Sequence, residues 1–151
     1  MIITICSTIK FWPQILAVKK QLEEMGHEVL IPPHEVPNQA GEMIPVEEYF
    51  KIRKEMVEKG ENIDWVWERK KEAMNWHFEK VNKADCILVL NYEKNGIANY
   101  IGGNVLLEIG LAFWLKKPIY FINPIPTELS YTEELRGMQP IVINGNLTSI
   151  K

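Results

Sequence analysis

One uninterrupted apolar run limits what this chain can fold into more than any other feature. Residues 85–91 read Asp-Cys-Ile-Leu-Val-Leu-Asn, so five apolar residues stand between two polar ones. A strand with apolar side chains at successive positions buries both of its faces, which is typical of a central strand in a parallel sheet covered by helices. The run therefore predicts an α/β fold.

Strand and helix patterns alternate along the rest of the chain. The β-branched run at the start predicts a strand, and the helix expected next has Pro13 near its start and Gly26 after its end. Prolines and a glycine between residues 32 and 45 predict a loop. We expect strands at 1–6, 28–31, 85–91, 118–123 and 141–143, and helices at 13–25, 46–58, 64–83, after residue 104 to about 117, and at 132–138.

This alternation predicts a three-layer sandwich in which helices cover both faces of a five-stranded parallel sheet. Right-handed crossovers favour the strand order 2-1-3-4-5. The sequence has no internal repeat, low-complexity tract or interdomain linker. We therefore expect residues 1–151 to form a single domain.

Composition and charge exclude several classes of protein. Seventeen Lys and Arg against twenty Asp and Glu give a net charge of −3, which excludes a strongly basic protein that binds nucleic-acid polymers. No apolar run reaches the roughly 18 residues that span a bilayer, and the N-terminus lacks a basic leader region. We expect a cytoplasmic protein without a membrane partner.

The cysteines and histidines do not predict a metal centre. Cys6 and Cys86 each lie within an apolar run, and the chain has three histidines. These residues have no recognisable zinc-ligand spacing. We expect reduced, buried thiols, with neither a metal nor a cofactor.

The topology predicts where a ligand binds. In a sheet of this kind the site lies beyond the carboxyl ends of the strands, near the point where the strand order reverses. The loop after the first strand contains Ser7 and Thr8 but no glycine, which argues against a dinucleotide fingerprint or a Walker A loop. Ser7 and Thr8 can bind a small anion or simply cap a helix, and both interpretations stay open.

Glu108 is the most unusual residue in the sequence. It is the only ionisable side chain in residues 105–115, a segment whose apolar character predicts a buried helix. An unpaired charge there costs several kcal/mol, by order of magnitude. Glu108 occupies a narrow solvent-facing strip, helps to satisfy the backbone groups at the helix start, or is held at the mouth of a pocket. In the last case it stands one turn inside a helix that begins at Gly102, Gly103 and Asn104.

His77 also falls on an apolar helix face. Helical periodicity groups it with Val66, Ala73, Met74, Val81 and Ala84. Helix and strand rises of about 1.5 Å and about 3.3 Å per residue bring His77 and Glu108 to a similar level. His77 is either a core histidine or a second polar group of the site. The aromatic residues expected near the mouth either stack on a base or cover the core; they are Trp12, Tyr92 and Tyr100.

Two segments together resemble a known family. Residues 84–90, Ala-Asp-Cys-Ile-Leu-Val-Leu, are followed after a loop by residues 103–112, Gly-Asn-Val-Leu-Leu-Glu-Ile-Gly-Leu-Ala. An Ala-Asp-led strand and a glycine turn that opens a helix with Glu-x-Gly-x-Ala resemble the nucleoside 2-deoxyribosyltransferase superfamily. This superfamily includes the 2′-deoxynucleoside 5′-monophosphate N-glycosidases. The N-terminal strand with its serine, and the segment with Ser130 and Arg136-Gly137, extend the resemblance over most of the chain.

The resemblance implies a flavodoxin-like, Rossmann-like fold and roles for individual residues. Glu108 matches the nucleophile that attacks the anomeric carbon, and Ser7 matches a sugar- or phosphate-binding residue. Ser130 approximates a segment that reaches the neighbouring subunit's site, since these enzymes are built on dimers. His77 stands where the family usually has an aspartate. It is therefore a proton donor, a phosphate ligand, or the mark of a relative that has lost the reaction.

Three functions follow from these observations. The first is cleavage of the N-glycosidic bond, or deoxyribosyl transfer, on a nucleoside or nucleoside monophosphate through a covalent intermediate on Glu108. The second is non-catalytic binding of a nucleotide or nucleotide-sugar. The third, a flavodoxin-like carrier, lacks a recognisable phosphate loop.

We also expect a homodimer or a dimer of dimers, because the apolar helix at 105–115 offers more apolar surface than one sheet covers. The residues that we expect to bind the substrate are Ser7, Thr8, Trp12, Asn91, Tyr92, Tyr100, Gly102, Gly103, Asn104 and Ser130.

Overall fold

The computed structural model describes residues 1–151, which divide into two compact units. The sheet unit comprises Met1–Pro32 and Phe78–Lys151, and the small unit comprises Pro33–His77. Each has its own hydrophobic core. The single domain expected from the sequence stays a prediction.

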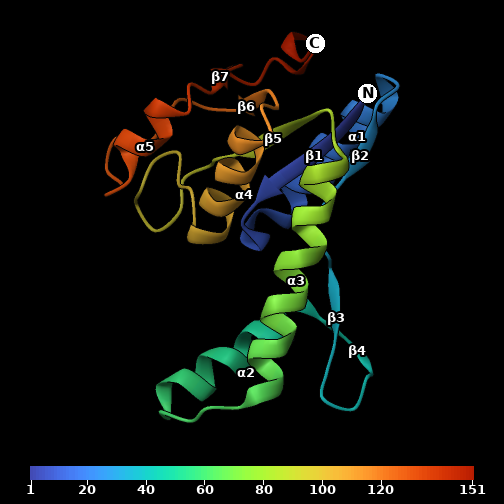
Figure 1. Ribbon diagram of the computed structural model, residues 1–151, viewed down its shortest axis with the longest axis vertical. Coiled ribbons are helices and arrows are strands. Elements are labelled where there is room, and N and C mark those ends of the chain that lie inside the picture. Colours follow the sequence, from blue (N-terminus) through green and yellow to red (C-terminus); the bar gives the residue numbers. More distant parts are fainter. The chain divides into compact units, whose positions relative to one another are not determined.

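The sheet unit contains the predicted α/β fold (Figure 1). Its five strands pair in the order β2-β1-β5-β6-β7, and every pairing is parallel. Counted along the chain within this sheet, that order is 2-1-3-4-5, so the predicted topology is confirmed. The strands are β1 (Ile2–Ser7), β2 (Glu28–Leu30), β5 (Cys86–Leu90), β6 (Ile119–Phe121) and β7 (Ile141–Val142).

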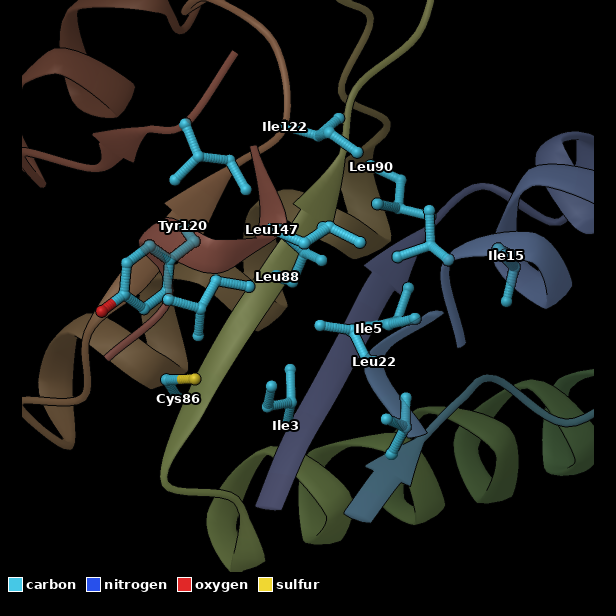
Figure 2. Close-up of a cluster of buried hydrophobic side chains, with 14 residues drawn as sticks. Ile3, Ile5, Ile15, Leu22, Cys86, Leu88, Leu90, Tyr120, Ile122 and Leu147 are labelled. Carbon is cyan, nitrogen blue, oxygen red and sulfur yellow. The ribbon is translucent and has the colours of Figure 1, made fainter. Parts of the chain in front are cut away.

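Side chains alternate between two cores, one on each face of the sheet. Ile3 and Ile5 of β1 belong to the first cluster together with Leu88 of β5, whereas Cys6 and Val89 belong to the second. This separation follows from the two-residue period of a strand. Figure 2 shows the first cluster, with side chains of β1 and β5 on the same side as Ile15 and Leu22 of the first helix. Because both faces are covered, β5 is buried at every position, as its apolar run predicted.

Helices cover both faces of this sheet. Helix α1 (Trp12–Glu24) contributes Ile15, Val18 and Leu22 to the first cluster. Helix α4 (Gly103–Trp114) contributes Val105, Ile109 and Ala112 to the second. The second cluster also includes Val81, from the end of α3 (Asp64–Lys83), and Leu135, from α5 (Thr132–Gly137). The three-layer arrangement is therefore confirmed, and no helix combines the length and apolar character needed to cross a membrane.

The small unit corrects one prediction. Residues 32–45, expected to be a loop, contain two antiparallel strands, β3 (Glu35–Pro37) and β4 (Met43–Pro45). The Asn38 side-chain oxygen accepts hydrogen bonds from the backbone N–H groups of Ala40 and Glu42, which closes the turn. Each proline stands at the end of its strand, where a missing N–H group is tolerated. Pro37 and Pro45 therefore end the two strands of a hairpin, and Gly41 lies in the turn between them, so this part of the segment is not a structureless loop.

A separate core holds the small unit together. Val36 and Ile44 from the hairpin pack with Tyr49 and Met56 of α2 (Val46–Glu58) and with Val66 at the start of α3. The Tyr49 hydroxyl donates a 2.7 Å hydrogen bond to the Val66 carbonyl, which ties α2 to α3. The bounds of α2 and α3 agree with those predicted from their periodicity.

Candidate active site

Strands β1 and β5 end at the same level, which brings their following loops together. Ser7 and Leu90 are register partners at the last positions of the two strands. The Ser7 hydroxyl lies 3.2 Å from the Leu90 carbonyl oxygen and 3.4 Å from that of Thr8. Thr8 occupies the N-cap position of a short 3₁₀ helix (Ile9–Phe11), but its side chain makes no capping hydrogen bond. The Thr8 side chain therefore does not cap the helix, which was one of the two roles expected for Ser7 and Thr8.

Glu108 lies on the buried face of α4. It shares that face with Val105, Ile109 and Ala112, and its exposed fraction is 8%. A position on a solvent-facing strip is therefore wrong. The cause is helical spacing, since residues 105, 108, 109 and 112 repeat at three- and four-residue intervals and turn toward the sheet together.

The other side of α4 is open, which corrects the expectation of a helix buried all round. Leu107, Phe113 and Trp114 are exposed to 50%, 53% and 81%. A helix that packs on one face of a sheet buries only the stripe facing that sheet. The single chain thus leaves an apolar surface on α4 uncovered.

Cys6 is the neighbour of Glu108 that sequence reasoning missed. Its Sγ and a carboxylate oxygen of Glu108 lie within 4.8 Å of one another, and the cysteine is completely buried. Burial raises the pKa of the Cys6 thiol well above its ordinary value, and the charge of Glu108 and the hydrogen bond with its side chain add to this effect. Cys6 is therefore a protonated thiol at neutral pH. Both cysteines are free and buried, as predicted.

His77 is the last residue of the small unit. Its exposed fraction is 4%, so it is buried as its apolar helix face predicted. It stands one turn before Val81 on the continuous helix α3, and positions four apart share a helix face. Val66 and Ala84 of the predicted stripe are buried too, whereas Ala73 and Met74 are partly exposed. A role of His77 in the site stays a prediction.

Asn91 joins the loops that follow β5 and β6. Its side-chain amide donates to the carbonyl oxygens of Asn123 and Pro124 at 3.1 and 2.8 Å, and its side-chain oxygen accepts from the Asn123 N–H at 3.0 Å. The residue is completely buried. These bonds connect the two loops, so Asn91 has a structural role in addition to the substrate contact expected from its position.

The aromatic residues expected near the mouth are partly buried. Trp12 and Tyr92 pack against the first cluster, and the Tyr92 ring meets Phe11 edge-on at 5.4 Å between centroids. Burial raises the pKa of the Tyr92 hydroxyl. Tyr100 holds the Lys94 ammonium 4.5 Å from its ring centroid. The packing interpretation is thus supported for Trp12 and Tyr92, and stacking of any of the three rings on a base stays a prediction.

The start of α4 has no side-chain cap. Gly102 is the N-cap residue in an extended conformation, and the helix begins at Gly103 with the exposed Asn104 next. The Tyr131 hydroxyl donates to the Ile101 carbonyl, which ties the loop before α5 to this helix start. Ser130 is exposed in that loop. The helix that carries Glu108 therefore begins with uncapped backbone amides, and the loop that follows β6 contacts this helix start through Tyr131.

Comparison with known proteins supports the fold. No protein-family model matches the chain, and no curated protein matches it in sequence. Among solved structures, it is similar to the 2-deoxyribosyltransferase of the psychrotolerant bacterium Bacillus psychrosaccharolyticus. That similarity has a TM-score of 0.52 and 14% sequence identity, and it covers 80% of this chain and 71% of that one. The architecture implied by the family resemblance is thereby confirmed.

Proposed function

We propose that the protein breaks the N-glycosidic bond of a nucleoside or nucleoside monophosphate, with Glu108 as the nucleophile. One observation carries this proposal. A carboxylate is buried on the inner face of α4, beside the carboxyl end of β1, where parallel α/β sheets bind their ligands. Polar groups that are costly to bury are typical of functional sites.

A carboxylate in this position suits a two-step mechanism. In the first step a carboxylate oxygen of Glu108 forms a bond with the anomeric carbon as the bond to the base breaks, and the bonding electron pair leaves with the base nitrogen. In the second step the oxygen of a water molecule, or the nitrogen of a second base, forms a bond with the anomeric carbon as the bond to Glu108 breaks and its electron pair returns to the carboxylate. A 2′-deoxy sugar favours this route because it lacks the hydroxyl that destabilises positive charge at the anomeric carbon.

His77 is the proposed proton donor to the departing base. Imidazole is the side chain that most often acts as a general acid, and His77 is buried as a group held in one orientation would be. His77 precedes Val81 by one helical turn, and Val81 shares a cluster with Cys6 and with the α4 residue Ile109.

The fold similarity supports this class of reaction. The similar structure is a 2-deoxyribosyltransferase described as a biocatalyst for the synthesis of nucleosides. We propose that the remaining predicted residues contact the sugar, base or phosphate, with Asn91 also holding the loops together. They are Ser7, Thr8, Trp12, Asn91, Tyr92, Tyr100, Gly102, Gly103, Asn104 and Ser130.

The exposed apolar face of α4 supports a homodimer or a dimer of dimers. Leu107, Phe113 and Trp114 are large side chains left open by the single chain, and such patches mark interaction surfaces. A partner would bring its Ser130 loop near this subunit's site. The cytoplasmic location expected from the sequence stays a prediction.

Non-catalytic binding of a nucleotide or nucleotide-sugar is the second candidate. The observation that favours it is His77 at a position where the family usually has an aspartate. A panel of deoxynucleosides, ribonucleosides and their 5′-monophosphates distinguishes the candidates by chromatography of the free base. Base release from a member of the panel supports the enzyme. Saturable binding in calorimetry without base release would assign the chain to the binding class instead.

A further inference from the structure

Cys6 and Glu108 form a buried pair of unlike polar groups. The thiol is completely buried and Glu108 is 8% exposed, and Sγ lies within 4.8 Å of a carboxylate oxygen. Cys6 reaches this position because it is the next-to-last residue of β1 and points into the second cluster, against which α4 packs. Both residues are held by regular secondary structure and not by loops.

A carboxylate among apolar side chains needs hydrogen-bond donors if it is to stay ionised in one orientation. Cys6 is one donor near Glu108, since its Sγ and a carboxylate oxygen of Glu108 lie within 4.8 Å of one another. An S–H group is a weak donor, but a hydrogen bond is stronger when its acceptor is an ionised carboxylate, which is the form a nucleophilic Glu108 needs. The raised pKa of the thiol keeps its proton in place at neutral pH.

We propose that Cys6 is a positioning residue, whose S–H group donates to a carboxylate oxygen of Glu108 and holds that side chain ready to attack the anomeric carbon. This inference rests on the proposed function of Glu108. It goes beyond packing, because it requires the donor hydrogen and not only the volume of the sulfur atom. No bond forms or breaks at the thiol.

Cys86 is a matched control within the same sheet. It too is a buried thiol on a central strand, but it packs in the first cluster, on the other face, and its sulfur contacts Met1 Sδ at 3.9 Å. A substitution at Cys86 therefore tests the loss of a buried thiol without affecting Glu108.

The kinetic experiment compares Cys6→Ala, Cys6→Ser and Cys86→Ala in the full chain. Cys6→Ala should lower kcat about tenfold with KM within twofold, because the donor is lost while the substrate contacts remain. Cys6→Ser restores a donor and should keep kcat within about threefold of wild type. Cys86→Ala should not change kcat. Equal losses of kcat in Cys6→Ser and Cys6→Ala, with both variants folded by circular dichroism, would overturn the proposal, and so would a fully active Cys6→Ala.

An infrared measurement separates this inference from the proposed function. In the Cys86→Ala background the S–H stretching band reports Cys6 alone. A thiol that donates to a carboxylate absorbs at lower frequency than a free one, so Glu108→Ala should move the band to higher frequency. A band that stays unchanged in Glu108→Ala overturns the inference whether or not the protein has activity. Absence of base release from every substrate, with the band shift observed, would instead reject the proposed function and leave the contact established.

Discussion

The side chain of Asn91 and the backbone of Asn123 are joined by reciprocal hydrogen bonds at the carboxyl edge of the sheet. Asn91 donates to the Asn123 carbonyl and accepts from the Asn123 N–H, while the Asn123 side chain donates to the Asn91 carbonyl at 3.1 Å. These bonds hold the loops after β5 and β6 at a fixed separation. The loop after β5 leads directly into α4, the helix that carries Glu108.

Asn91→Ala should lower the free energy of unfolding by about 2–4 kcal/mol, because it leaves buried backbone groups of residues 123 and 124 without their partner. Asn123→Ala is the matched control, since it removes one side-chain bond from a partly exposed residue and should cost about 1 kcal/mol. Urea denaturation followed by circular dichroism measures both. Equal stability of Asn91→Ala and wild type would show that the link between the loops contributes nothing.

Glu108→Ala should abolish base release, with a loss of at least about 10³-fold in kcat, because the nucleophile is missing. The fold should stay intact, since removing a buried carboxylate also removes its desolvation cost. A 2-deoxy-2-fluoro substrate should leave a covalent adduct on the peptide that contains Glu108, detected by mass spectrometry. Glu133→Ala, on the exposed side of α5, should behave as wild type. Retained turnover in Glu108→Ala rejects the mechanism.

His77→Asn should lower kcat about 100-fold on ordinary purine substrates, because the departing base then leaves without its proton donor. The loss should be much smaller on the corresponding N7-methylated purine substrate, whose base already carries a positive charge. Asn75→Ala, an exposed position on the same helix, serves as control. An equal loss of kcat on both substrates would assign His77 to the core and not to proton transfer.

Stability should fall at alkaline pH through the buried thiols. Burial is the main cause that raises the pKa of Cys86 to about 11, from 9.0. The folded protein therefore binds the thiol proton more tightly than the unfolded chain, so this contribution is complete below about pH 9 and is lost as the pH rises toward 11. The slope is at most about 1.4 kcal/mol per pH unit for each thiol.

Urea denaturation of wild type and Cys86→Ala between pH 8 and pH 10.5 isolates this effect. The wild-type free energy of unfolding should decrease more steeply than that of the variant. Tyrosines with raised pKa, such as Tyr92, contribute with the same sign in both proteins and cancel in the difference. Parallel curves would show that the Cys86 thiol titrates alike in the folded and unfolded chains.

Trp114→Glu should reduce the mass measured by light scattering from that of a dimer or larger assembly to that of a monomer at micromolar concentration. A charge at the most exposed aromatic residue of α4 opposes burial against a second subunit. Leu16→Glu on α1 is the matched control, because Leu16 is also an exposed apolar helix residue, at 45%. A wild-type monomer at this concentration would contradict the assembly outright.

The sheet topology could be read from the sequence because its signals are local. The apolar run of β5, the periodicity of α2 and α3, and the order of these elements each depend on neighbouring residues, and parallel sheets allow few ways of connecting them. The β3–β4 hairpin was missed because its strands are three residues long and flanked by prolines. Such short strands depend on burying Val36 and Ile44 in a core that the linear sequence does not display.

The candidate site also has features that the sequence predicts and features that depend on the tertiary structure. The sequence by itself determined that Glu108 is the exceptional residue of α4, because it is the only ionisable side chain among the eleven residues 105–115. Only the tertiary structure decided that Glu108 faces inward and that Leu107, Phe113 and Trp114 face outward, since both sides of that helix are apolar and the sheet selects one. The thiol of Cys6 beside Glu108 could not be predicted from the sequence, because the two residues are 102 positions apart and meet only when α4 packs against the end of β1.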